Sequence, residues 1–290
     1  MLKAENLNVY YGNKKVISNA SFDISPGEIV GLIGPNGAGK STIMKTLLGL
    51  TKFTGKVLLN NKNILTQHQE ISNKVGALIE GPAAYPFLSG KENLELYSND
   101  ESDMDNLIRL LKMEPYIDQR VKNYSIGMKE KLGIALALLN NPEFVILDEP
   151  MNGLDIESTI LVRKIIKEYS SRGTAFLISS HVLSELQKVM TSIIIVNHGK
   201  IIMDLPIEDF HQIQNSHYQI NTENNQKTLN LFKANNITVE SDENHIIISN
   251  SDLRKAQQVI FSNGLTLTEL MPADSNFEQA IVSVLQKSKG

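Results

Sequence analysis

The 290-residue sequence contains no cysteine, so it can form neither a disulfide framework nor a thiolate metal site. It also has no basic excess: the formal net charge of −4 argues against a protein whose main partner is a nucleic acid. No apolar run approaches 18 residues, and the N-terminus lacks the apolar core of a secretion signal. We therefore expect a soluble intracellular protein whose membrane role, if it has one, comes through a partner.

The most informative stretch lies between an apolar run, 29–33, and a helical pattern that begins at Ile43. It has the pattern G-x-x-x-x-G-K-[ST] of phosphate-binding loops and consists of Gly34, Pro35, Asn36, Gly37, Ala38, Gly39, Lys40, Ser41 and Thr42. Glycines let consecutive N–H groups point at a phosphate, at the positive end of a helix dipole. We expect Lys40 to reach the β- and γ-phosphates of a nucleoside triphosphate and the Ser41 hydroxyl to ligate Mg²⁺.

Two acids follow a second apolar run, residues 144–147, which has the character of a central strand in a parallel sheet. Such a strand would deliver Asp148 to the surroundings of Mg²⁺, and Glu149 beside it can polarise the attacking water. A further anion site is expected at Ser125 and Gly127, because a small hydroxyl and a glycine open the helical pattern that contains Leu132.

The order of these motifs resembles the nucleotide-binding subunit of ATP-binding-cassette (ABC) transporters over residues 1 to about 205. The resemblance implies that Ser125 and Gly127 close on the γ-phosphate of a second subunit, and that Asp155 communicates across that dimer. It also implies that His181 contacts the γ-phosphate. Tyr11 either stacks on adenine, as the resemblance implies, or is simply a tyrosine at the end of a strand.

Two features depart from the usual family pattern. Tyr124, Ile126 and Met128 replace three of the five residues of the Leu-Ser-Gly-Gly-Gln signature, while Ser125 and Gly127 are kept. Glu80 stands where the family usually has the glutamine that touches Mg²⁺ and the attacking water. A carboxylate has similar reach but adds negative charge and cannot donate a hydrogen bond when ionised. Glu80 is therefore either a catalytic and metal-binding residue or a loop acid without nucleotide contact.

The segments around Glu80 and Ser125 resemble the subgroup that exports bacitracin-type and lantibiotic peptides, which also carries a C-terminal extension. Tyr85, Phe87 and Leu88 would form a dry groove for a permease's coupling helix, or they pack inward between subdomains. The resemblance implies an ATPase that binds ATP and Mg²⁺ and acts at the cytoplasmic face of a bacterial cell membrane. Its expected partners are integral-membrane permease subunits and a second copy of itself or a homologous ATPase subunit.

The expected fold is an α/β P-loop domain with a mostly parallel core sheet, an antiparallel β-subdomain and a helical subdomain. We assign residues 1–205 to this domain, about 80–140 to the helical subdomain, 206–216 to a linker and 217–290 to an accessory module. The pattern in the module predicts strands at 217–221, 237–240, 244–249 and 265–270, with helices at 224–234, 252–263 and 275–287. This βαββαβ order resembles a ferredoxin-like module.

Three other functions are alternatives to peptide-antibiotic export. Export of sodium or of a drug by a related system stays open, because the permease selects the cargo. A soluble ABC ATPase acting on ribosomes or DNA fits poorly with one P-loop, no heptad array and an acidic balance. A P-loop GTPase is excluded because no Asn-Lys-x-Asp element for reading guanine occurs in the sequence.

Overall fold

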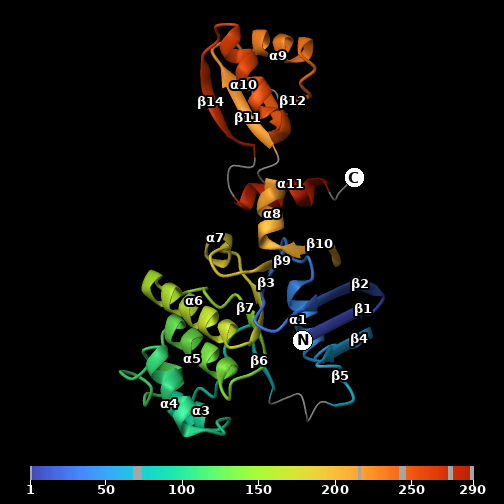
Figure 1. The fold of residues 1–290 in the computed structure, drawn as a ribbon. Helices are drawn as coiled ribbons and strands as arrows, with labels where there is room; N and C mark the ends of the chain where they lie inside the picture. The colour runs from blue at the N-terminus through green and yellow to red at the C-terminus, as the bar shows by residue number, and fades with distance from the viewer. Residues whose placement is uncertain (1, 68–73, 215–216, 242–245, 274–276, 288–290) are drawn as a thin grey trace. The chain divides into compact units, whose positions relative to one another are not determined.

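The computed structural model describes residues 2–67, 74–214, 217–241, 246–273 and 277–287 (Figure 1). The chain divides into two compact units, Met1–Pro206 and Ile207–Gly290, which are described separately below. Within the described residues, no helix is both long and apolar enough to cross a membrane.

The first unit contains two sheets. One is an antiparallel sheet in the order β2-β1-β4-β5, built from β1 (Leu2–Tyr11), β2 (Lys14–Ile24), β4 (Phe53–Leu59) and β5 (Lys62–Asn63). The other has the order β10-β9-β3-β8-β7-β6 and consists of β3 (Ile29–Ile33), β6 (Val75–Leu78), β7 (Phe144–Asp148), β8 (Ala175–Ser179), β9 (Ser192–Asn197) and β10 (Lys200–Pro206). All of its neighbouring pairs are parallel except β9 and β10. The mostly parallel core sheet and the antiparallel β-subdomain are confirmed.

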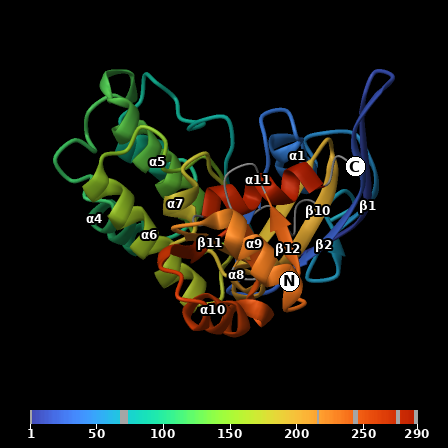
Figure 2. The same ribbon diagram turned by 90° about the horizontal axis from the view of Figure 1, so that it is seen from above.

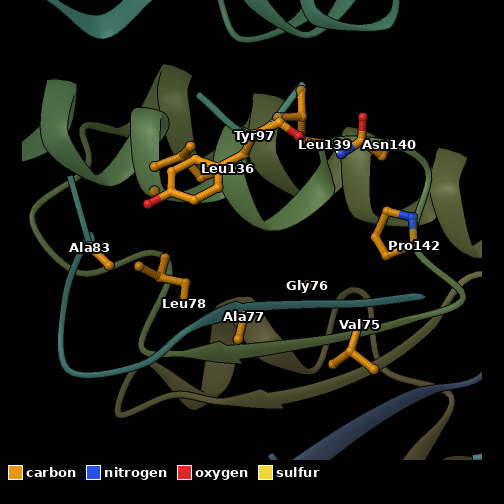
Figure 3. A pocket seen from close by; sticks show the side chains of 11 residues that line it. Val75, Gly76, Ala77, Leu78, Ala83, Tyr97, Leu136, Leu139, Asn140 and Pro142 are labelled. Carbon is orange, nitrogen blue, oxygen red and sulfur yellow. Dashed lines mark hydrogen bonds between the residues drawn. The ribbon is translucent and has the colours of Figure 1, made fainter. Parts of the chain in front are cut away.

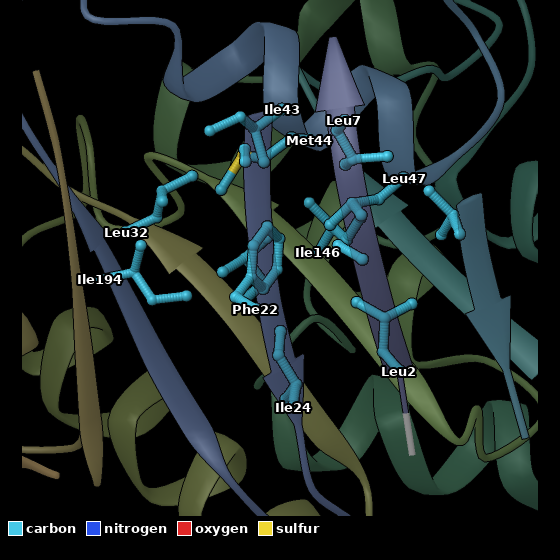
Figure 4. Close-up of a cluster of buried hydrophobic side chains, with 14 of the residues drawn as sticks. Leu2, Leu7, Phe22, Ile24, Leu32, Ile43, Met44, Leu47, Ile146 and Ile194 are labelled. Carbon is cyan, nitrogen blue, oxygen red and sulfur yellow. The ribbon is translucent and has the colours of Figure 1, made fainter. Parts of the chain in front are cut away.

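A single hydrophobic core joins the two sheets to helix α1 (Lys40–Leu47). Figure 4 shows side chains of β1 and β2, such as Phe22, facing Ile43, Met44 and Leu47 of α1 and residues of the core sheet such as Ile146. All five of these side chains are buried, and burial of each such side chain contributes about 1.5–3 kcal/mol to folding. The core therefore fixes α1, and with it the phosphate-binding loop, against both sheets.

Helices lie on the other side of the core sheet, and those between residues 80 and 140 fall in the segment predicted to be the helical subdomain. They are α3 (Gly90–Glu95), α4 (Glu101–Leu110), the 3₁₀ turn η2 (Val121–Asn123) and α5 (Ile126–Leu138), with α6 (Ile156–Ser171) and α7 (Leu183–Leu186) later in the chain. Figures 1 and 2 both place α4, α5 and α6 away from β1, β2 and α1. A capping box starts α3, because Ser89 and Glu92 each accept a hydrogen bond from the other's backbone N–H.

The second unit contains a four-stranded antiparallel sheet in the order β12-β13-β11-β14. Its elements are α8 (Ile207–Gln214), β11 (His217–Thr222), α9 (Asn225–Ala234), β12 (Val239–Ser241), β13 (Ile246–Ser249), η3 (Asn250–Asp252), α10 (Leu253–Ser262), β14 (Leu267–Pro272) and α11 (Phe277–Lys287). Phe232 of α9 and Ile260 of α10 pack with Ile220 and Ile248 of the sheet in one hydrophobic core. From β11 to β14 the chain follows the βαββαβ order of a ferredoxin-like module, as predicted.

Helix α8 corrects one prediction about the second unit. Residues 206–216 were expected to form a linker, but Ile207–Gln214 is helical, and Phe210 stacks edge-to-face on Phe277 of α11 at 5.2 Å between ring centroids. The apolar spacing of Ile207 and Phe210 is the helical signal that a compositional change at Pro206 obscured. Parts of three predicted elements lie outside the described residues: 215–216 of the linker, 244–245 of the strand at 244–249, and 275–276 of the helix at 275–287.

Candidate nucleotide-binding site

The phosphate-binding loop connects β3 to α1, and close contacts demand its glycines. A Cβ on Gly34 would lie 2.2 Å from the carbonyl oxygen of Val196, a clash with backbone. Gly39 has a φ of 111° and its Cβ would lie 2.5 Å from Ile17 Cδ1, so the residue that precedes α1 must be glycine. The first N–H groups of α1 therefore open onto the loop, the arrangement that binds phosphate at a helix N-terminus.

Lys40, the first residue of α1, folds back over this loop. Its ammonium donates hydrogen bonds to the carbonyl oxygens of Gly34 at 2.7 Å and Pro35 at 3.3 Å. Burial lowers the pKa of Lys40, and the nearby carboxylates of Glu149 and Asp148 oppose that effect. A partly desolvated cation held at the mouth of the loop is suited to bind phosphate oxygens.

Asp148 joins three elements at the carboxyl edge of the core sheet. Its Oδ2 accepts a hydrogen bond from Ser41 Oγ of α1 at 3.0 Å, and its Oδ1 accepts one from Ser179 Oγ at the end of β8. Asp148 pairs with Ser179 in the parallel register of β7 and β8, so the sheet itself aligns the two side chains. Ser41 and Asp148 are thus brought together as predicted, while Ser179 was missed.

Glu149, the residue after Asp148, has a φ of 58°, which is an uncommon conformation for a residue that is not glycine. Its N–H donates to Ser179 O at 3.2 Å and to Ser179 Oγ at 3.1 Å. Its carboxylate accepts the His181 N–H at 2.8 Å and lies 3.3 Å from His181 Nε2. The turn therefore aims Glu149 at His181, and the two predicted residues meet.

Glu80 is placed differently from the other predicted residues. It comes two residues after β6 with a φ of 58°, and its Oε1 lies 2.5 Å from Lys45 Nζ on α1. Tyr11 is the last residue of β1 and is half exposed. The predicted metal contact of Glu80 and adenine stacking by Tyr11 stay predictions.

Ser125, Gly127 and Asp155 occupy another place in the first unit. Ser125 caps α5 by accepting the Met128 N–H at 3.2 Å, and Asp155 caps α6 by accepting the Ser158 N–H at 2.7 Å. This backbone hydrogen bond is the main cause that lowers the pKa of Asp155. All three predicted residues line one cavity of about 370 Å³, and no residue of the phosphate-binding loop is among its described lining residues.

Sequence reasoning missed Ser179 and Lys45. Ser179 ends a buried apolar run, and a hydroxyl at the carboxyl end of a parallel strand is the signal that could have identified it. Lys45 lies four residues after Ser41 and hence on the same face of α1, but only the tertiary structure brings Glu80 to it.

The fold and this site define a P-loop nucleotide-binding protein. A family model described as ABC transporter matches residues 17–152. The lantibiotic transport ATP-binding protein SrtF of Streptococcus pyogenes is 38% identical over 70% of this chain and 90% of its own length. The bacitracin transport ATP-binding protein BcrA of Enterococcus faecalis is 29% identical over 96% of this chain and 94% of its own. A solved ATP-binding subunit of an ABC transporter superposes with a TM-score of 0.69, at 27% identity over 73% of this chain and 92% of its own.

The chain belongs to the ABC transporter family, as one of its ATP-binding subunits. These subunits bind ATP and hydrolyse it, so this chain is an ATPase, and the residues around the phosphate-binding loop are its candidate site.

Replacement of Lys40 tests that assignment. Lys40→Ala removes the cation at the loop, and we expect ATP hydrolysis to fall at least about 100-fold, the cost of losing one strong electrostatic contact to a transition state. Phosphate release from the purified chain with saturating ATP measures this loss. Lys56→Ala, an exposed lysine on β4, is the control and should hydrolyse ATP at the wild-type rate. Wild-type activity in Lys40→Ala would contradict the assignment.

Proposed function

We propose that this chain dimerises on ATP and powers a separate membrane permease, with peptide antibiotics as the exported cargo. The observation that carries the proposal is the division of the motifs between two places. Lys40, Asp148 and Glu149 gather at the carboxyl edge of the core sheet. Ser125 and Asp155 line the separate 370 Å³ cavity. Such a division is expected when each site is completed by a second subunit, either another copy of the chain or a homologous ATPase subunit.

The residues around Ser41 fit a Mg²⁺ ion. A hydroxyl and a carboxylate 3.0 Å apart are oxygen ligands of the kind this cation prefers, and Ser41 and Asp148 would hold it. Within the described residues there is no group of three or more His, Cys, Asp or Glu placed to hold a metal. Phosphate oxygens and water would therefore supply the remaining ligands, as is usual for Mg²⁺. When bound, the cation neutralises charge that develops on the β- and γ-phosphates.

Glu149 is proposed as the residue that orients and polarises the attacking water. Its carboxylate is fixed by the His181 N–H, while its backbone is fixed by Ser179. A carboxylate held in this way accepts a hydrogen bond from water without having to reorganise. The His181 ring, whose Nε2 lies 3.3 Å from Glu149, is more than half exposed, so a γ-phosphate oxygen can reach it.

A Glu149→Gln substitution tests the dimer. Glutamine keeps an acceptor for the His181 N–H but has no negative charge to polarise water, so binding should persist while hydrolysis stops. We expect ATP with Mg²⁺ to convert this variant from monomer to dimer, measured by size-exclusion chromatography with light scattering. Adding Ser125→Arg, which fills the cavity at the start of α5, should prevent that conversion. A Glu149→Gln chain that stays monomeric with saturating ATP would contradict the dimer.

An apolar surface beside the helical subdomain supports docking of a permease. A cavity of about 360 Å³ lies between β6 and α5, with Leu78, Tyr97 and Leu136 on its walls (Figure 3). Close by in the chain, after the lining residue Ala83, the rings of Tyr85 and Phe87 lie 5.6 Å apart. Tyr85 is 45% exposed and Phe87 is 63% exposed, so these rings favour a docking surface over inward packing.

The loop that presents these rings is rigidly held. Asn93 is fully buried; its amide oxygen accepts the Tyr85 N–H at 2.7 Å, and its amide nitrogen donates to the carbonyls of Tyr85 and Ser89. Tyr85 and Phe87 are thus fixed in position before any partner arrives, which lowers the entropic cost of binding.

Loss of the two rings tests the docking surface. In cells that produce the permease, we expect a Tyr85→Ala/Phe87→Ala chain to lose at least about tenfold of its membrane-bound fraction, because aromatic anchors dominate interfaces. Membrane sedimentation and immunoblotting measure that fraction. Phe261→Ala is the matched control, since Phe261 of α10 is also 63% exposed, and it should leave the fraction unchanged. An unaltered fraction in the double variant would contradict docking at these rings.

The proposed cargo rests on the transport proteins SrtF and BcrA, whose names refer to lantibiotics and bacitracin. The proposed location is the cytoplasmic face of a bacterial membrane, where the chain is held by its permease. The proposed nucleotide-binding domain is 1–205, and 217–290 is proposed as an accessory module that the full-length likeness to BcrA supports. Export of sodium or a drug is the second candidate, because the permease selects the cargo.

Deletion of the gene tests the cargo. We expect the deletion strain to become at least about fourfold more sensitive to bacitracin or to a lantibiotic, because export protects the cell. Minimum inhibitory concentrations of a panel of both measure the change, and the wild-type gene should restore resistance whereas the Lys40→Ala gene should not. Altered sensitivity only to sodium or to unrelated drugs would favour the second candidate.

A further inference from the structure

Lys45 lies within the nucleotide site although no motif includes it. It follows Ser41 by four residues on α1, so the two side chains share one face of the helix. Its ammonium is 2.5 Å from Glu80 Oε1. The hydrogen bond to Glu80 is the main cause that raises the pKa of Lys45, and the charge of Asp148 raises it further. Lys45 is therefore a charged ammonium that faces the carboxylates of the site.

Glu80 reaches this place because of the sheet register. In the parallel pair of β6 and β7, Leu78 lies beside Leu147, so the chain after β6 leaves the sheet at the level of Asp148 and Glu149. Positive φ angles at Glu80 and Gly81, 58° and 108°, then turn the chain sharply. The Glu80 carboxylate thus comes to the same edge of the sheet as the metal-binding oxygen atoms of Asp148.

A second ion pair lies at the other end of β6, away from Glu80. Lys74 precedes β6 and lies 2.6 Å from Glu143, which precedes β7. The two pairs have the same chemistry and similar length, but only the Lys45–Glu80 pair lies at the carboxyl edge where the phosphate-binding loop is found. The Lys74–Glu143 pair is therefore a matched control for any effect that requires proximity to the nucleotide.

We propose that Lys45 is a positioning residue that holds the Glu80 carboxylate at the edge of the metal site and cancels its charge. Glu80 then acts on the cation through this pair and not as a direct ligand. A lone carboxylate there would attract a divalent cation, and a lone ammonium would repel it. With the pair intact, the acid in place of the family's neutral glutamine leaves the charge around the cation unchanged. The inference rests on the proposed Mg²⁺ site.

A double-mutant cycle on cation affinity tests the pair without measuring hydrolysis. The full chain is saturated with a non-hydrolysable ATP analogue, Mn²⁺ replaces Mg²⁺, and free Mn²⁺ is measured by electron paramagnetic resonance. Coulomb's law in water gives about a fivefold effect for one charge about 8 Å from a divalent ion. Lys45→Met should therefore tighten Mn²⁺ binding about fivefold, and Glu80→Gln should weaken it about fivefold. The double variant should return to within about twofold of wild type.

Two further variants make the result specific. Lys45→Arg keeps the charge and should bind Mn²⁺ like wild type, and Lys74→Met breaks the pair at the far end of β6 and should do the same. If Lys45→Met leaves the affinity unchanged while Glu80→Gln weakens it, Glu80 acts without Lys45 and the inference is overturned. If the wild-type chain binds the analogue with no dependence on Mn²⁺, the proposed metal site itself fails and the inference fails with it.

Discussion

The hydrogen bonds that Asp148 accepts from Ser41 and Ser179 are the interaction on which the site depends. They join α1, β7 and β8, three elements distant in sequence, at one edge of a parallel sheet. Because neighbouring parallel strands end at the same edge, the register that pairs Asp148 with Ser179 also sets the backbone of Glu149. The carboxylate of Glu149 then accepts the His181 N–H, so a single alignment organises the acids, the hydroxyls and the histidine of the candidate site.

The arrangement also explains why the core is built as it is. Phosphate binding needs a helix N-terminus held still, and α1 is held by buried residues that contact both sheets. The polar groups of the site then lie on a surface that folding has already made rigid. On the other side of the core sheet, Asn93 does the same for the loop of Tyr85 and Phe87 by satisfying backbone groups from a fully buried position. One rigid unit thus presents a nucleotide site and an apolar surface at separate places.

Much of this could be predicted because the relevant signals are local. The loop at 34–42, the apolar run before Asp148 and the capping box at Ser89 each depend on neighbouring residues, so the sequence pattern predicts them directly. The order of strands and helices after residue 217 follows from hydrophobic periodicity in the same way. The linker prediction at 206–216 was wrong because a change in composition was given more weight than the periodicity that forms α8.

The sequence by itself determined the chemistry: a phosphate-binding loop, a carboxylate pair, and the hydroxyl and glycine of Ser125 and Gly127 at the start of a helix, each specified by short-range pattern. Only the tertiary structure decided which side chains face one another. It placed Ser179 on Asp148, His181 on Glu149, and Lys45 on Glu80, contacts between residues about 30 or more positions apart. Such contacts arise from strand register and helix packing, which pair residues through space, so a local pattern can point to one partner but not to the pair. The contact through space matters most for Glu80, because Lys45 makes this otherwise isolated acid one half of an ion pair.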